Sequence, residues 1–214
     1  MNPIRLTVVT ALALTATGIT VAAAAPTPPR SGCAIVTDAV GDTAANVGAP
    51  AGVPRADEGV DITVVDVAST SKWIGARVRV ARLDATTMAT GGESFEVTMN
   101  VGGGTLVMGA GRYANATGIS GDDKYAYAGF QRGTLAPRDV PARAVQIVVD
   151  PAVHAVAVFV DRAALRDIGA DTYGYLSGIS ATSGRQYADT ATVGYDDAAG
   201  PQAYKLGASS CLRF

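Results

Sequence analysis

The sequence predicts an all-β protein, an antiparallel β-sandwich of the jelly-roll or immunoglobulin-like kind with one short helix. From residue 60 onward, short runs rich in Val, Ile, Thr and aromatic residues alternate with turn residues. In the run WIGARVRVARL, arginines alternate with Ala and Val, as expected for a strand with one wet face and one packed face. No regular alternation of strands and helices follows, which argues against an α/β fold.

The beginning of the chain has the features of a secretory signal peptide. Arg5 provides a positive charge, residues 6–21 are apolar or small, and the alanines of residues 22–25 are suited to cleavage. We therefore expect a secreted protein with three parts: a signal peptide over residues 1–25, a flexible tail over residues 26–32 and a single β-sandwich domain over residues 33–214.

Two alternatives for this segment are disfavoured by particular residues. An uncleaved membrane anchor fits poorly with a Thr- and Ala-rich span that ends directly before Pro26. Lipidation of Cys33 would require an apolar residue three positions earlier, where the chain has Arg30. The mature form is thus expected to have no membrane span.

Nine strands are expected in the domain. They cover residues 33–37, 60–69, 73–83, 93–101, 105–113, 124–131, 144–150, 153–161 and 173–183. Residues 41–59 contain Gly, Pro and Ala without periodicity and predict a long surface loop. The run VGGGTL and the pair Asp150-Pro151 predict hairpin turns. The one helical signal is DRAALRDIG, where Asp161 can cap the first turn and Gly169 can end the helix.

Charge and cysteine content restrict the class of protein. Without Arg5 the chain has 16 basic and 19 acidic residues, a net charge of about −3, so no nucleic-acid-binding surface is indicated. In an oxidising compartment Cys33 and Cys211 predict one disulfide that joins the two ends of the domain. Closing so long a loop stabilises by about 5 kcal/mol in the chain-entropy model. Two free thiols or a metal pair are the weaker alternatives.

Catalytic patterns have little support in the sequence. His154 is the only histidine, and no Gly-x-Ser-x-Gly elbow accompanies it, so a surface or structural role is favoured over a hydrolase triad. The only three glutamates are Glu58, Glu93 and Glu96, and they fit solvated loops and strand faces better than a glycosidase pair. The run GAGRYA matches a loose dinucleotide fingerprint but leads into no helix, so a turn is expected there.

Two acidic loops are candidates for a calcium site. Asp38 and Asp42 lie in one of them, and Asp57, Glu58 and Asp61 lie where the long loop enters the next strand. Calcium binds several oxygen ligands that such loops can supply, although the spacing is not that of an EF-hand. Ordinary acidic turns remain the alternative.

The chain as a whole resembles secreted actinobacterial β-sandwich domains that are similar to family-nine carbohydrate-binding modules and to the DOMON superfamily. The resemblance lies in TDAVGD, VDITVVDVAS, WIGARVRVARL, FEVTMNVGGGTLVMGAG, DRAALRDIG and YADTATVGY. It implies a sandwich whose chain ends are close together. It also implies a structural calcium held by Asp38, Asp42 and Asp61, with Asp189 as an additional candidate.

The resemblance further directs attention to the aromatic residues. Family-nine modules that bind sugars clamp the ligand between two aromatic rings, typically tryptophans, whereas this chain has only Trp73. Tyr125 with Tyr127, and Tyr173 with Tyr175, are spaced to share a strand face and are candidate substitutes. Burial of these rings in the core is the alternative.

These observations together predict a secreted, non-catalytic binding or structural module. Its expected ligand is an extracellular polysaccharide or cell-wall component, with calcium stiffening the loops. An extracellular hydrolase that uses His154 and a protein-interaction domain are the alternatives.

Overall fold

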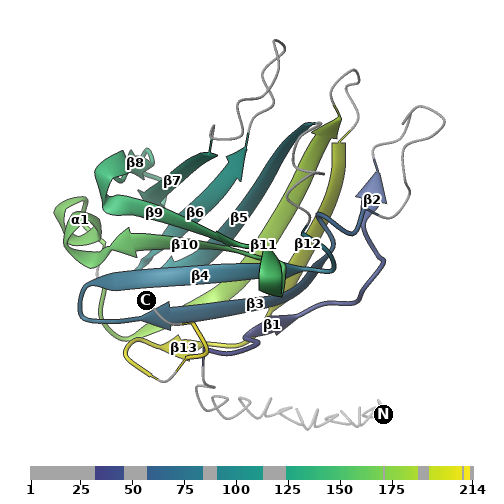
Figure 1. Cartoon of the computed structure of the whole chain (residues 1–214). Coiled ribbons are helices and arrows are strands. Elements are labelled where there is room, and N and C mark those ends of the chain that lie inside the picture. Colours follow the sequence, from purple (N-terminus) through teal and green to yellow (C-terminus); the bar gives the residue numbers. More distant parts are fainter. Residues whose placement is uncertain are drawn as a thin grey trace, which may run out of the picture.

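The structure is a computed structural model that describes residues 32–45, 57–83, 91–112, 124–170, 172–187, 193–208 and 210–212. Two antiparallel sheets lie against each other (Figure 1), so the prediction of an all-β sandwich is confirmed. The expected signal peptide lies outside the described residues, as does nearly all of the expected tail. In the part of the chain that the structure describes, no helix is long and apolar enough to span a membrane.

The smaller sheet has five strands and the larger has eight. The smaller sheet has the order β1 (Val36–Thr37), β3 (Ile62–Ser69), β4 (Trp73–Val80), β10 (Ala155–Asp161) and β9 (Val145–Asp150). The larger sheet has the order β2 (Ala44–Ala45), β12 (Val193–Gly200), β11 (Tyr175–Tyr187), β5 (Gly91–Val101), β6 (Gly104–Arg112), β7 (Lys124–Gln131) and β8 (Arg138–Asp139), and β13 (Tyr204–Lys205) pairs with β11.

The core lies between the two sheets and follows the alternation of the strands. On β4, Ile74, Ala76 and Val78 are buried, while Arg77 and Arg79 lie on the outer face. On β5 of the facing sheet, Phe95, Val97 and Met99 are buried in the same cluster. A period of two therefore assigns one face of each strand to the core.

The short connections largely follow the predicted signals. Gly102 and Gly103 form the hairpin turn between β5 and β6, with φ angles of 52° and 79°. The helix α1 (Arg162–Asp167) begins after Asp161, whose carboxylate accepts a hydrogen bond from the Ala163 N–H at 2.7 Å. Two 3-10 turns flank β9: η2 (Ala142–Ala144) and η3 (Pro151–Val153).

Two expectations about local structure are wrong. Gly109 to Arg112 of the run GAGRYA do not form a turn, because they continue β6, in agreement with the strand expected over residues 105–113, and pair with β5 and β7. The expected loop at residues 41–59 contains the short strand β2, which pairs with β12. Both errors arise because cross-strand pairing overrides the local preferences of these segments, such as the turn tendency of Gly.

The disulfide between Cys33 and Cys211 is present, with a Cα–Cα distance of 5.2 Å. It holds the C-terminal segment beside β3, where the Ser210 hydroxyl donates a hydrogen bond to the Val67 carbonyl at 2.6 Å. The Val67 N–H donates to the Gly32 carbonyl at 2.8 Å. Both ends of the domain are thus fixed to one strand.

Candidate functional site

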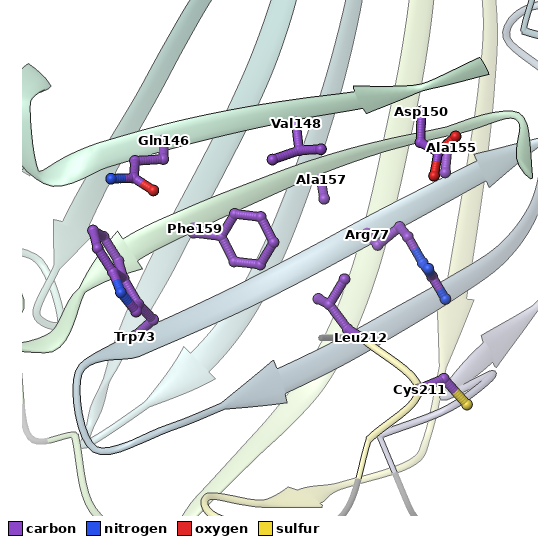
Figure 2. A pocket seen from close by; sticks show the side chains of 10 residues that line it. All are labelled: Trp73, Arg77, Gln146, Val148, Asp150, Ala155, Ala157, Phe159, Cys211 and Leu212. Carbon is purple, nitrogen blue, oxygen red and sulfur yellow. The ribbon is translucent and has the colours of Figure 1, made fainter. Parts of the chain in front are cut away.

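A groove with a volume of about 410 Å³ lies on the outer face of the smaller sheet. Its lining comes from β4, β9, β10 and the C-terminal segment (Figure 2): Trp73, Arg77, Gln146, Val148, Asp150, Ala155, Ala157, Phe159, Cys211 and Leu212. The volume lies in the usual range for ligand pockets.

The groove forms where small residues of β4 and β10 lie beside larger side chains. In the strand register, Phe159 lies between Gln146 of β9 and Gly75 of β4. Ala157 occupies the next outward position of β10, and it leaves room beside Val148. The small side chains of β10 thus lie lower than the larger side chains on the neighbouring strands. The base of the groove that results is apolar.

One wall of the groove is the disulfide-linked C-terminal segment. Leu212 packs with Ala157 and Phe159 in a small apolar cluster, and the half-buried Trp73 packs against that cluster. In Figure 2, Leu212 and Val148 lie on opposite sides of Phe159 and Ala157. The single tryptophan of the chain therefore lies at one end of a formed groove and not in the central core.

Polar side chains occupy both ends of the groove. Gln146 lies near Trp73, whereas Arg77 and Asp150 lie at the other end (Figure 2). The Arg77 guanidinium donates to the fully buried Asp66 carboxylate from Nε at 2.9 Å and from Nη2 at 2.8 Å. This buried partner fixes the position of Arg77, so the groove offers a preorganised hydrogen-bond donor.

A second candidate site is an acidic corner where the two sheets meet. Carboxylate oxygens of Asp38, Asp42 and Asp196 lie within 4.8 Å of one another. Asp196 comes from β12 of the larger sheet, and its Oδ2 accepts a hydrogen bond from the Ile62 N–H of β3 at 2.7 Å. The strand pairing, and not proximity in sequence, brings the three carboxylates together.

Asp61 lies beside this corner and is 2% exposed. Its Oδ2 accepts a hydrogen bond from the Gly41 N–H at 2.8 Å, while its buried Oδ1 has no hydrogen-bond partner among the described residues. The buried Oδ2 of Asp38 also has none. Buried carboxylate oxygens without a partner are costly in the absence of a cation.

The surroundings make two of these carboxyl groups harder to ionise. Burial raises the pKa of Asp196 to about 6, against the lowering effect of the hydrogen bond from Ile62, and the nearby Asp42 and Asp38 raise it further. The pKa of Asp61 is also raised, chiefly by burial. Negative charge is thus concentrated at this corner.

The sequence anticipated part of this set. The prediction grouped Asp38, Asp42 and Asp61; the first two lie together, Asp61 lies beside them, and the third carboxylate of the cluster comes from Asp196. Asp189 lies outside the described residues. Asp196 was missed, because its burial between the exposed Tyr195 and Asp197 is visible only in the structure.

The four candidate tyrosines lie in two separate places. Tyr125 and Tyr127 lie on one face of β7, with ring centroids 6.2 Å apart and planes at 10°. Tyr173 and Tyr175 do not share a strand face, because Tyr173 precedes β11 and the intervening Gly174 has a φ of 88°. Tyr173 is 70% exposed, with the Arg162 guanidinium 5.8 Å from its ring.

No protein-family model, curated protein or solved structure matches this chain. The resemblance to family-nine modules and to the DOMON superfamily therefore remains a prediction, and function is inferred from the geometry of the surfaces.

His154 lies in the turn between β9 and β10. It is exposed and has a φ of 51°. Its Nδ1 lies 3.2 Å from the Leu83 nitrogen and 3.4 Å from the Leu83 oxygen. Within the described residues, these contacts with the Leu83 backbone are the hydrogen bonds of the His154 ring, and none of them joins it to a serine or a carboxylate.

Proposed function

We propose that this protein is a secreted, non-catalytic module that binds an extracellular glycan in the groove of the smaller sheet. One observation carries the proposal. The chain's only tryptophan lines an apolar groove that also contains an amide, a guanidinium and a carboxylate. A sugar ring has an apolar C–H face and an edge of hydroxyl groups, which matches this combination.

The polar groups have complementary roles toward such a ligand. A hydroxyl both donates and accepts hydrogen bonds. Asp150 accepts, Arg77 donates and the Gln146 amide does both, so each end of the groove can satisfy hydroxyl groups. Trp73 and the wall residue Leu212 would cover the apolar face of the ring.

We also propose that the acidic corner binds calcium. Asp38, Asp42 and Asp196 would provide carboxylate oxygens, and Asp61 lies beside them with an oxygen that has no hydrogen-bond partner in the part of the chain that the structure describes. Calcium takes about six to eight oxygen ligands, so backbone carbonyls or water would complete the set. The ion would neutralise the carboxylates and connect the loop after β1 to β12, which stiffens one end of the sandwich.

The glycan proposal is tested with Trp73 as the reporter. A glycan array identifies a ligand, and titration of the soluble ligand is followed by tryptophan fluorescence, which reports only on the groove. We expect Gln146→Ala to weaken binding about tenfold, since two or more hydrogen bonds depend on one planar side chain. Trp73→Ala, followed by calorimetry, should abolish binding.

The control for these variants is Leu135→Ala, because Leu135 is an exposed apolar residue on the loop between β7 and β8. Its affinity should equal that of the wild type. Absence of any array signal, or affinity that survives Trp73→Ala, overturns the proposal.

The calcium proposal is tested by thermal unfolding. Calcium should raise the Tm of the wild type relative to protein in chelator, because it binds only the folded corner. Asp196→Asn should remove most of this increase, while Asp139→Asn, at an exposed site on β8, should keep it. Equal unfolding curves with calcium and with chelator would contradict the site.

A further inference from the structure

The outer face of the larger sheet carries two tyrosine rings that lie flat across the neighbouring strand. A Cβ built on Gly109 of β6 would lie 2.3 Å from the ring of Tyr127, and one built on Gly111 would lie 2.4 Å from the hydroxyl of Tyr125. The rings therefore occupy the space that these glycines leave empty. Tyr127 remains 40% exposed, so part of its ring is open to solvent.

A carboxylate extends this aromatic surface. In the register, Gly109 of β6 lies between Tyr127 of β7 and Glu96 of β5. The Tyr127 hydroxyl donates a hydrogen bond to Glu96 Oε2 at 2.5 Å. Glu96 is thereby held in a fixed position at the edge of the ring.

The same rows continue across the sheet to a third tyrosine. Beyond Glu96 the row contains Thr182 of β11 and Asp197 of β12. The adjacent row ends in Tyr195, which is 44% exposed. Small or polar groups thus lie between aromatic rings on β7 and on β12, over the width of five strands.

The charged side chains described on the outer face of these strands are acidic. Glu96 and Asp197 are acidic, and none of the described outward side chains of β5, β6, β7, β11 and β12 is basic. The faces of aromatic rings attract cations, and so do carboxylates. An extended ligand that fits here has flat rings and positive charges.

We infer that this face is a second binding surface and that its ligand is a cationic glycan, a chain of amino sugars with free amino groups. The inference rests on the proposed function in one respect: it takes from it that the ligand is a glycan. The groove and this face lie on opposite outer faces of the sandwich, so the two sites would act independently and one molecule would hold two glycan chains.

The test compares three probes by isothermal titration calorimetry at low salt: a glucosamine hexamer, its N-acetylated counterpart and hexalysine. The glucosamine hexamer should bind, and its N-acetylated counterpart should bind at least about tenfold more weakly because it lacks the charges. The double variant Glu96→Gln, Asp197→Asn should weaken glucosamine binding at least about fivefold. It keeps the side-chain shapes and therefore the fold.

Two controls separate this surface from the groove and from net charge. Asp167→Asn changes the charge on α1 and should leave affinity unchanged, as should Trp73→Ala. Loss of affinity in Trp73→Ala would place the glucosamine chain in the groove and overturn the inference. Failure of the proposed groove function is seen separately, in the array and the Trp73 titration.

Three further outcomes overturn the inference. One is equal binding of the N-acetylated hexamer, which would exclude the cationic class. Another is glucosamine affinity that the double variant leaves unchanged. The third is hexalysine that binds as tightly as the glucosamine hexamer with the same dependence on Glu96 and Asp197, because the face would then recognise basic peptides.

Discussion

At the scale of single residues, one buried carboxylate of the smaller sheet fixes the arginine at one end of the groove. Asp66 is fully buried on the outer side of β3 and holds Arg77 and Arg79, and it also accepts a hydrogen bond from the Ala34 N–H at 2.8 Å. The Asp66 carboxylate thus connects the N-terminal segment with Arg77 at one end of the groove.

Asp66→Ala should destabilise the protein by about 3 kcal/mol, because it leaves two guanidinium groups and one N–H without their partner. Urea unfolding measures this change. The exposed pair of Arg82 and Glu58, 3.9 Å apart, provides the comparison, and Glu58→Gln should cost less than about 0.5 kcal/mol. Similar costs for the two variants would contradict the importance of the buried carboxylate.

Asp196 makes stability depend on pH in the calcium-free protein. Its folded pKa of about 6 lies above the unfolded value of 3.8, so the folded state binds the proton more tightly. The contribution of this group to stability is therefore full below about pH 4 and is lost as pH rises through 6. Between pH 7 and pH 5 the wild type should gain about 1 kcal/mol relative to Asp196→Asn, as measured by urea unfolding in chelator. A pH dependence that is the same in both proteins would refute this assignment.

At the scale of elements, alternation and turn chemistry explain most of the strands. The hairpin of β5 and β6 is an example, because its two central residues both have positive φ and both are glycine. The pairing of β6 with β7 shows the limit of local signals, since Gly109 and Gly111 are needed there for the rings of another strand.

Gly103 allows a clean test of the turn. A Cβ there meets no atom within 4 Å, so a substitution acts mainly through backbone strain. Gly103→Val should cost about 1–2 kcal/mol, while Gly103→Asn should cost clearly less because Asn tolerates the left-handed region. Equal losses in thermal unfolding of the two variants would argue against strain as the cause.

At the scale of the whole molecule, the disulfide joins residues separated by 178 positions and positions one wall of the groove. Gly32 and Ser210 both hydrogen-bond to Val67 of β3, and Ala68 of the same strand joins Leu212 and Phe159 in the apolar cluster. The same covalent bond therefore contributes to stability and shapes the groove proposed to bind a ligand.

Replacing both cysteines with serine should lower the free energy of unfolding by up to about 5 kcal/mol in the chain-entropy model. It should also release Leu212 from the groove and expose Trp73, which acrylamide quenching of tryptophan fluorescence detects. Quenching that does not change would mean that the wall is held without the disulfide. A milder reduction experiment on the wild type provides the same comparison without a change of sequence.

The sequence by itself determined the fold class, most strands and the disulfide. These follow from local rules: a period of two decides which face of β4 is buried, and a chain with two cysteines allows only one pairing within it. Only the tertiary structure decided which residues meet. Asp196 joins Asp38 and Asp42 because β12 lies beside the first strands, and the groove exists because Gly75 lies opposite Phe159 while Cys33 holds Leu212 over β10. Such contacts depend on strand order and register, which long-range packing selects and which no local pattern encodes.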